Sequence, residues 1–290
     1  MASMRDIKRR KKSVSSTQKI TKAMKLVSTV KLQKAKQKAE NTNPYFNYMY
    51  STVCSMLDRA GAIDHPYLKA GESNKKAIIT ISSNRGLAGG YNSNITKLIT
   101  GSDIAREEIL LYTIGKKAHD ALDSRGYKVA AEHDQVMEAP TYDDAMDISR
   151  EVLEAFTKGE VGEIYLAYTH FKNTVSHEPR LLKLLPVDIK EEDIKGGDEE
   201  DKDSKMLMNF EPNPEEALDM IVPKYVTSLI YGALVEAVAS ENGARMQAMD
   251  SATNNAEDII SDLTLKYNRA RQGSITQELT EIIAGAEAIS

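Results

Sequence analysis

The segment from Ser82 to Asn92 is the part of the sequence with the clearest potential for ligand chemistry. It holds Gly86, Gly89 and Gly90 between a strand-like run and a helix-like run, an arrangement that binds phosphate in many nucleotide-binding domains. The spacing fits neither G-x-G-x-x-G nor G-x-x-x-x-G-K-[ST], and no acid follows where it would hold a ribose. A tight turn explains these glycines better, and a nucleotide-binding enzyme stays as a rival hypothesis.

The other reactive side chains form no catalytic or metal-binding pattern. The histidines are scattered, without the H-x-x-x-H or H-E-x-x-H spacing of a zinc site; they are His65, His119, His133, His170 and His177. The single cysteine, Cys54, excludes an intrachain disulfide and a C-x-x-C site, and its helical surroundings predict an inert, buried thiol. We therefore expect no metal, no cofactor and no catalytic residue.

The composition favours a folded protein built largely from helices. Of 290 residues, 41% are hydrophobic and 28% charged, which supports a packed core and argues against global disorder. Aromatic residues make up 6% and tryptophan is absent, which favours long helices over a β-sandwich. No run approaches the roughly 18 apolar residues of a membrane span, and the N-terminus lacks the apolar core of a signal peptide.

Charge is distributed unevenly between the N-terminus and the rest. Residues 1–38 carry 13 Lys and Arg and one acid, Asp6, whereas the remaining 252 residues have a net charge of −17. Such a basic arm predicts an anionic partner or pairing between the chain ends. Nucleic acid, an acidic protein and a plain solvated face all stay open, although residues 5–38 contain no aromatic side chain for stacking on bases.

A long seam without charge runs through the C-terminal part of the chain. Its positions alternate in spacing between three and four residues, and sixteen in succession are uncharged although the 53-residue stretch holds 11 charges; they are Leu218, Ile221, Tyr225, Ser228, Gly232, Val235, Ala239, Asn242, Met246, Met249, Thr253, Ala256, Ile260, Leu263, Tyr267 and Ala270. The seam predicts a coiled-coil helix over 214–288. Beyond Ala270 the apolar line shifts to Ile275, Leu279, Ile282, Ala286 and Ile289, which unwinds a left-handed supercoil.

The N-terminal residues 3–58 contain no glycine and can supply the partner helix. Their narrower apolar stripe consists of Ile7, Val14, Thr21, Met24, Val27, Leu32, Ala35 and Ala39. Two helices of one chain, separated by a domain, pair naturally in antiparallel fashion. At about 1.5 Å per residue, the C-terminal helix should extend some 30 Å beyond its partner.

Residues 76–186 alternate strand-like and helical runs, which predicts an α/β domain with a largely parallel sheet. We expect strands at Lys76–Ser82, Glu108–Ile114, Tyr127–Glu132 and Glu163–Tyr168, and helices at Asn92–Ile99, Lys116–Ser124 and Asp143–Lys158. The predicted fold is thus a long antiparallel coiled coil with an inserted α/β, Rossmann-like domain. Its parts are an N-terminal helix (1–60), the α/β domain (75–187), an acidic loop (188–210) and a C-terminal helix (211–290).

Two terminal segments closely resemble a known family. The segment Ile20–Leu32 reads ITKAMKLVSTVKL, and Tyr267–Ala286 contains the pattern I-T-Q-E-x-x-E-x-x-x-G-A. Together they resemble the gamma subunit of bacterial F-type ATP synthases, and the turn RGLAGGYN at 85–92 agrees. The resemblance covers essentially the whole chain.

This resemblance implies a central rotor that carries torque between an ion-driven c-ring and a catalytic head of alpha and beta subunits, also touching the epsilon subunit. It implies a subunit that is noncatalytic by itself, has no nucleotide or nucleic acid as a ligand, and lies peripherally at the cytoplasmic face of a bacterial cell membrane. A coiled-coil adaptor that binds nucleic acid or an acidic protein through residues 5–38 is the alternative.

The resemblance also implies residue roles. Contact with the head and coupling are expected at Met24, Lys22, Lys25, Arg245, Gln272, Thr276, Glu278 and Glu281. A foot for the c-ring and the epsilon subunit is expected at Met208, Phe210 and Glu211. Two departures are Asn84, where the family often has Asp, and Gly273, where it usually has Ala; a glycine inside a helix costs about 1 kcal/mol.

Overall fold

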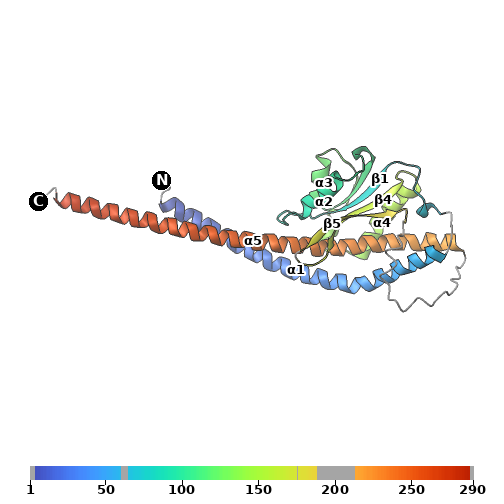
Figure 1. Ribbon diagram of the computed structural model, residues 1–290, viewed down its shortest axis with the longest axis horizontal. Helices are drawn as coiled ribbons and strands as arrows, with labels where there is room; N and C mark the ends of the chain where they lie inside the picture. The colour runs from blue at the N-terminus through green and yellow to red at the C-terminus, as the bar shows by residue number, and fades with distance from the viewer. Residues whose placement is uncertain (1–3, 60–64, 175, 188–212, 288–290) are drawn as a thin grey trace. The chain divides into compact units, whose positions relative to one another are not determined.

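The computed structural model describes residues 4–59, 65–174, 176–187 and 213–287 (Figure 1). Its contacts divide the chain into two compact units: a first unit of residues 1–29 with 245–290, and a second unit of residues 30–244. Two long helices, α1 (Met4–Arg59) and α5 (Pro214–Glu287), contribute to both units. Their ends lie within one residue of the helices predicted at 3–58 and 214–288.

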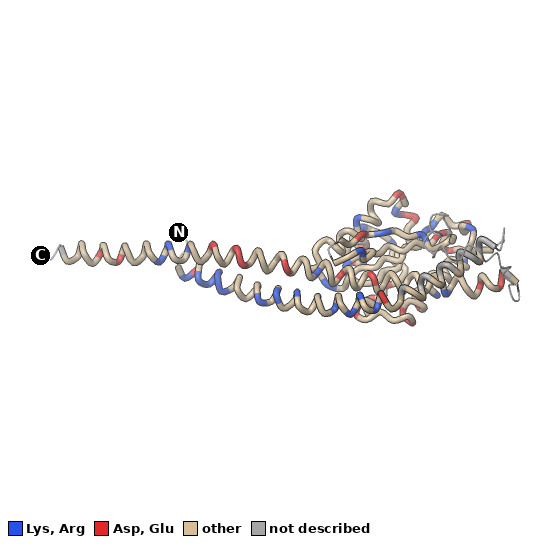
Figure 2. The backbone as a smooth tube through the Cα atoms, turned by 60° about the horizontal axis from the view of Figure 1, so that its bottom comes forward, with Lys and Arg blue, Asp and Glu red and all other residues tan. Residues whose placement is uncertain are grey.

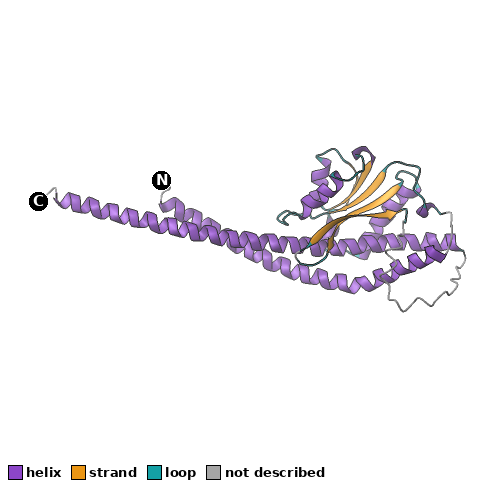
Figure 3. Cartoon of the chain, in the orientation of Figure 1, coloured by secondary structure: helices purple, strands orange, loops and turns teal. Residues whose placement is uncertain are grey.

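The second unit contains a five-stranded sheet in the order β3-β2-β1-β4-β5 (Figure 3). Strands β1 to β4 are parallel and β5 is antiparallel to β4. The strands are β1 (Lys76–Ile81), β2 (Ile109–Ile114), β3 (Lys128–Glu132), β4 (Glu163–Phe171) and β5 (His177–Leu185), and the intervening α-helices are α2 (Tyr91–Thr100), α3 (Lys116–Asp123) and α4 (Tyr142–Thr157). The mixed α/β fold and the four predicted strands are confirmed, whereas β5 is an additional strand.

The sheet separates two hydrophobic cores, because successive side chains of a strand point to opposite faces. In β1, Ile79 and Ile81 belong to a core that also contains residues of α4 and α5, whereas Ile78 belongs to a core with residues of α2 and α3. All five residues of β1 after Lys76 are buried. This continuous burial is expected of a parallel strand that helices cover on both faces.

Helix α5 supplies much of the first core. Its residues 225–230 are all buried, and Leu218, Val222 and Leu234 are completely inaccessible to solvent. Glu236 is the one charged residue between 225 and 239 because few positions there meet water. Part of α5 is long and apolar enough to cross a membrane by length and composition, but 61% of that window is buried in the protein, which is typical of a core helix.

In the first unit, the two long helices form an antiparallel pair. Thr21 Oγ1 and Thr253 Oγ1 are 2.7 Å apart, and Lys25 Nζ donates to Asp250 Oδ1 at 2.6 Å. As the residue number increases from 21 to 25 along α1, the residue number of the partner on α5 decreases from 253 to 250, so the two helices are antiparallel, as predicted. None of the sixteen seam positions of α5 is exposed, so the charge-free pattern correctly identifies the buried face.

In the second unit, the ends of β4 and β5 pack on α5 at one glycine. A Cβ atom at Gly243 would lie 2.7 Å from His177 Cε1 and 3.1 Å from Nε2, closer than real atoms approach. The ring of His177 also contacts the Phe171 ring, with centroids 5.9 Å apart. The imidazole thus lies close to both a backbone that carries no side chain and an aromatic ring.

This contact predicts that Gly243→Ala destabilises the protein although alanine favours helix. The added methyl group must displace the His177 ring, and such overpacking costs about 1–3 kcal/mol. Gly273→Ala is the matched control, since a Cβ atom at Gly273 would have no other atom within 4 Å, and it should instead stabilise α5 locally by about 0.5–1 kcal/mol. Urea unfolding combined with local hydrogen exchange measures both effects; a Gly243→Ala protein as stable as wild type would contradict this packing.

Candidate functional site

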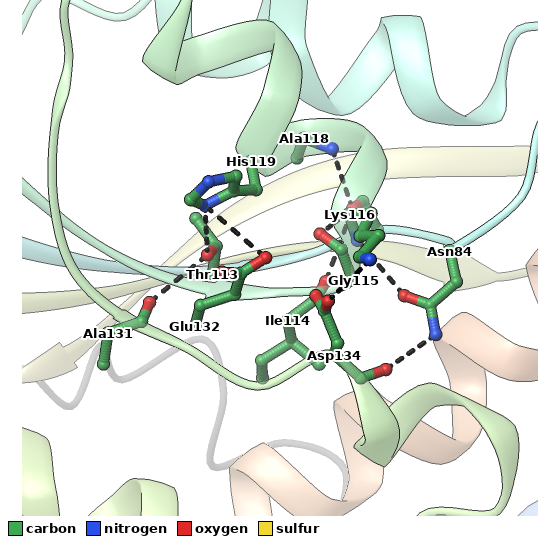
Figure 4. A network of polar contacts seen from close by, with 11 residues as sticks. Asn84, Thr113, Ile114, Gly115, Lys116, Ala118, His119, Ala131, Glu132 and Asp134 are labelled. Carbon is green, nitrogen blue, oxygen red and sulfur yellow. Dashed lines mark hydrogen bonds and ion pairs between the residues drawn. The ribbon is translucent and has the colours of Figure 1, made fainter.

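The loop after β1 uses its polar groups to hold the start of α3. The first three amides of α3 are all paired with this loop: Lys116 N donates to Asn84 Oδ1 at 3.1 Å, Lys117 N to Ser83 O at 3.0 Å, and Ala118 N to Ser82 Oγ at 3.0 Å. Figure 4 shows Asn84 bridging further to the backbone oxygen of Asp134 at 2.6 Å. The helix N-terminus that could bind a phosphate is thus capped from within the chain.

The first turn of α2 is also tied to this loop, where Tyr91 N donates to Ala88 O at 3.1 Å. Asn92 Oδ1 accepts hydrogen bonds from Ser83 N at 3.0 Å and Ser83 Oγ at 2.9 Å. Gly115 has φ of +89°, and a Cβ there would lie 2.2 Å from Ser82 O, so the two loops pack backbone to backbone. Among the glycines of the 82–92 segment, Gly89 has a φ of +56°, which favours the tight-turn interpretation at that position.

Four histidines of the second unit, His65, His119, His133 and His170, each lie beside a single carboxylate. His133 Nε2 is 3.1 Å from Glu151, His65 Nε2 is 3.2 Å from Asp219, and His119 Nδ1 is 4.0 Å from Glu132, as Figure 4 shows for the last pair. Across the part of the chain that the structure describes, no three His, Cys, Asp or Glu side chains gather as a metal site requires. These pairs join neighbouring elements of the fold.

The basic N-terminal helix α1 is a better candidate for a binding surface than the loop after β1 or the histidines. In Figure 2, Lys and Arg are concentrated along α1 and acidic residues are spread along α5. Lys19 and Lys22 are exposed, whereas Lys25 pairs with Asp250 across the helix pair. In the second unit, Lys38 donates to Pro140 O and lies 5.4 Å from the centre of the Tyr231 ring. Some basic side chains of α1 thus have partners within the chain, whereas Lys19 and Lys22 are exposed to solvent.

The buried face of α1 differs from the predicted stripe at Val27. That side chain is 58% exposed, and the neighbouring Ser28 is 2% exposed instead. Steps of four and three from Thr21 lead to Lys25 and Ser28, so a small polar residue occupies the seam. The prediction of Val27 was wrong because it followed hydrophobicity rather than spacing; large apolar side chains point outward here, namely Ile20, Leu26 and Val27, each at least 58% exposed.

Beyond Arg271, the first unit continues as α5 alone. Residues 271–286 are exposed, apart from Ser274, which is half-buried, and we call this segment the tip. Its apolar side chains Ile275, Leu279, Ile282 and Ile283 are 45–68% exposed. The expected overhang is confirmed (Figure 1), and its apolar surface has no covering helix within the first unit.

The residues expected to contact the head fall into two groups. Met24, Lys22, Lys25 and Arg245 belong to the paired part of the first unit; Met24, Lys25 and Arg245 are half-buried and Lys22 is exposed. The remaining four belong to the exposed tip: Gln272, Thr276, Glu278 and Glu281. About 20 residues of α5, roughly 30 Å, separate Asp250 from the tip. Met208, Phe210 and Glu211 lie outside the described residues.

Comparison with known proteins assigns the family. The family model described as ATP synthase matches residues 3–289. The ATP synthase gamma chain of Lachnoclostridium phytofermentans is 68% identical over the full length of both chains, and that of Alkaliphilus metalliredigens is 45% identical over 99% of this chain and 98% of its own. The chain belongs to the ATP synthase gamma-chain family. The predicted central-stalk rotor role is thereby confirmed, and the nucleic-acid adaptor is left without support.

Solved structures show the same fold. The central stalk and c-ring structure of the Tetrahymena thermophila mitochondrial ATP synthase contains a chain that is 25% identical, with a TM-score of 0.59, covering 80% of this chain and 99% of its own. The rotor of the Euglena gracilis mitochondrial enzyme contains a chain that is 18% identical, with a TM-score of 0.68, covering 94% of this chain and 98% of its own.

A further sequence relative is the gamma chain of Acetobacterium woodii, named as sodium ion specific, which is 40% identical over 99% of both chains.

The Lys25–Asp250 pair predicts a measurable contribution to helix pairing in the first unit. Lys25→Asp should place two acids face to face and weaken the pair by about 0.5–1 kcal/mol, the usual size for partly exposed ion pairs. The double variant with Asp250→Lys should recover most of the loss, and salt should reduce the difference. Hydrogen exchange of residues 245–256 measures it, and a double variant no more protected than Lys25→Asp would contradict the pairing.

Proposed function

We propose that this chain is the noncatalytic shaft of its synthase, with the first unit inserted into a head of alpha and beta subunits. The observation that carries the proposal is the tip: a single helix that exposes Ile275, Leu279, Ile282 and Ile283. Exposed apolar surface of this kind marks an interaction site. The spacing of these four side chains puts them on one face of α5, and head subunits that enclose the tip would cover this apolar face.

The outward face of α1 supports a second contact with the head. Ile20 and Val27 lie seven residues apart, on one face of the helix, and Lys19 and Lys22 are also exposed on α1. Exposed apolar and basic side chains on one helix would suit a partner surface in the head that is acidic and also has apolar side chains to pack against them. Because exposed ion pairs contribute only about 0–1 kcal/mol each and are screened by salt, such contacts can be exchanged as the shaft turns.

Torque would enter through a different part of the chain. We place the foot at Met208, Phe210 and Glu211, by their match to the family, against the c-ring and the epsilon subunit. The proposal includes a peripheral location at the cytoplasmic face of the bacterial membrane, where such an assembly would hold the chain without inserting it. The solved Tetrahymena structure, of a central stalk together with a c-ring, supports a contact between such a stalk and the c-ring.

The noncatalytic role is supported by how the polar groups are used. The amides at the start of α3 donate to the loop after β1, and His65, His119 and His133 each pair with one carboxylate. The chemistry would therefore occur in the head, and this chain would change the state of those sites through rotation.

Removing the tip should weaken binding to the head and lower coupled synthesis. A chain that ends at Arg271 loses every apolar side chain of the tip, and full burial of each contributes roughly 1.5–3 kcal/mol. A chain that ends at Ala286 is the control and should behave like wild type, because helix ends tolerate change. ATP synthesis in vesicles reconstituted with the complete enzyme measures the effect. If the Arg271 chain assembles and synthesises ATP at the wild-type rate, the tip makes no functional contact.

Charge changes on α1 should uncouple the machine more than they prevent assembly. Lys22→Glu reverses an exposed charge, and Met24→Lys adds a charge at a half-buried apolar position; we expect ATP hydrolysis to persist while ion pumping falls. Lys97→Glu, a change on α2 in the second unit, is the control. Parallel assays of hydrolysis and pumping in the assembled enzyme test this, and unchanged pumping in both α1 variants would remove these residues from the contact surface.

A further inference from the structure

In the second unit, the β4–β5 hairpin attaches to α5 at three positions on one helical face. Glu236 Oε2 is 2.7 Å from His170 Nδ1, and Ser240 Oγ donates to Thr169 O at 3.1 Å. Gly243 accommodates the ring of His177. The spacing of four and three residues puts Glu236, Ser240 and Gly243 on one side of α5. At the last of these positions, the imidazole of His177 packs against the backbone of a glycine.

His177 differs from the other described histidines in its hydrogen bonding. Both of its ring nitrogens are buried and have no hydrogen-bond partner among the described residues. A neutral imidazole tolerates this environment better than an imidazolium, which carries two N–H donors and a charge that must be solvated or paired. Burial accordingly lowers the pKa of His177.

The charged groups around this contact leave His177 without a counter-ion. On β4 and α5, His170 and Glu236 are occupied with each other. On β5, Glu178 pairs with Lys172 and Arg180, and it points to the face of the strand opposite His177. Tyr168 stays neutral because burial raises its pKa to about 12. Glu241, two residues before Gly243 on α5, has a contact of its own, and burial is what lowers the pKa of His177.

We propose that His177 is an acid-sensitive latch, which holds the start of β5 against Gly243 of α5 while its ring is neutral and releases it when the ring is protonated. His170 on β4 is held separately, by its 2.7 Å contact with Glu236. Acid therefore loosens the β5 side of the hairpin while the β4 side stays attached. The latch would make the coupling between the sheet and the long helix depend on pH.

The direction of the effect follows from proton linkage. The released hairpin binds a proton on His177 more readily than the docked one, so docking is stable above the ordinary histidine pKa of about 6.5 and is lost as the pH falls. One proton changes the opening equilibrium by at most about tenfold per pH unit. Below about pH 6.5, the protection of the latch against hydrogen exchange should decrease with falling pH, by up to about tenfold per pH unit.

Hydrogen exchange of the full-length chain from about pH 7.5 to about pH 5.5, corrected for the intrinsic exchange rate, tests the latch. Peptides that cover residues 176–182 and 238–246 should lose protection on acidification in the wild type. In His177→Gln, which keeps a polar side chain that does not titrate, the protection of both segments should be independent of pH. His119→Gln, at a half-buried histidine on α3, is the matched control and should keep the wild-type slope.

Gly243→Ala separates the latch from general instability. It should lower protection at every pH by displacing the ring and should not steepen the dependence on pH. Retention of the wild-type slope in His177→Gln would overturn the proposal. So would a wild-type chain whose protection does not change with pH, or loss of the slope in His119→Gln.

Discussion

The charge-free seam of α5 is the constraint on which both units depend. In the second unit the helix must be covered nearly all round, and residues 225–230 are buried without exception. In the first unit only one side of α5 is covered, by α1. Seam residues such as Met249, Ala256 and Leu263 are buried there, whereas many residues of α5 outside the seam are exposed. A charge at any buried seam position would have to be desolvated without a partner, which costs several kcal/mol. The uninterrupted absence of charge is therefore a requirement of packing.

The partner helix meets this constraint with small and polar residues. Thr21 and Ser28 are buried in α1, and Thr21 finds its hydrogen-bond partner in Thr253. Small side chains let the helices approach closely, and the contact between Thr21 and Thr253 links the two helices in addition to the bond that each hydroxyl makes to its own helix backbone, Thr21 to Gln18 O and Thr253 to Met249 O. The large apolar residues of α1 are then available for the outer surface, where Ile20, Leu26 and Val27 lie.

These features explain what could be predicted from the sequence. The long helices, their antiparallel pairing and the overhang follow from a repeat that persists over many heptads. The α1 seam could not be predicted from hydrophobicity because its spacing leads to Lys25 and Ser28. Strand β5 escaped notice because Pro179, Arg180 and Lys183 interrupt its apolar residues, and pairing with β4 on one side decides its structure. The role of Gly243 depends on His177, which lies 66 residues away in sequence, and no local pattern reveals such a contact.

The chemistry of the tip suits a shaft that must turn inside its partner. Ile275, Leu279, Ile282 and Ile283 form one aliphatic face of the tip, and its other exposed positions are small, polar or charged, with Glu278 and Glu281 as its acidic residues. Apolar contact has no preferred direction and depends mainly on the area that is buried, so rotation within a collar exchanges one aliphatic contact for another at little cost. A buried ion pair would be lost and remade at each step, and leaving one charge unpaired costs about 3–5 kcal/mol. A bearing made of apolar side chains therefore turns with smaller barriers than one made of salt bridges, and charged contacts fit better on the exposed face of α1, where water screens them.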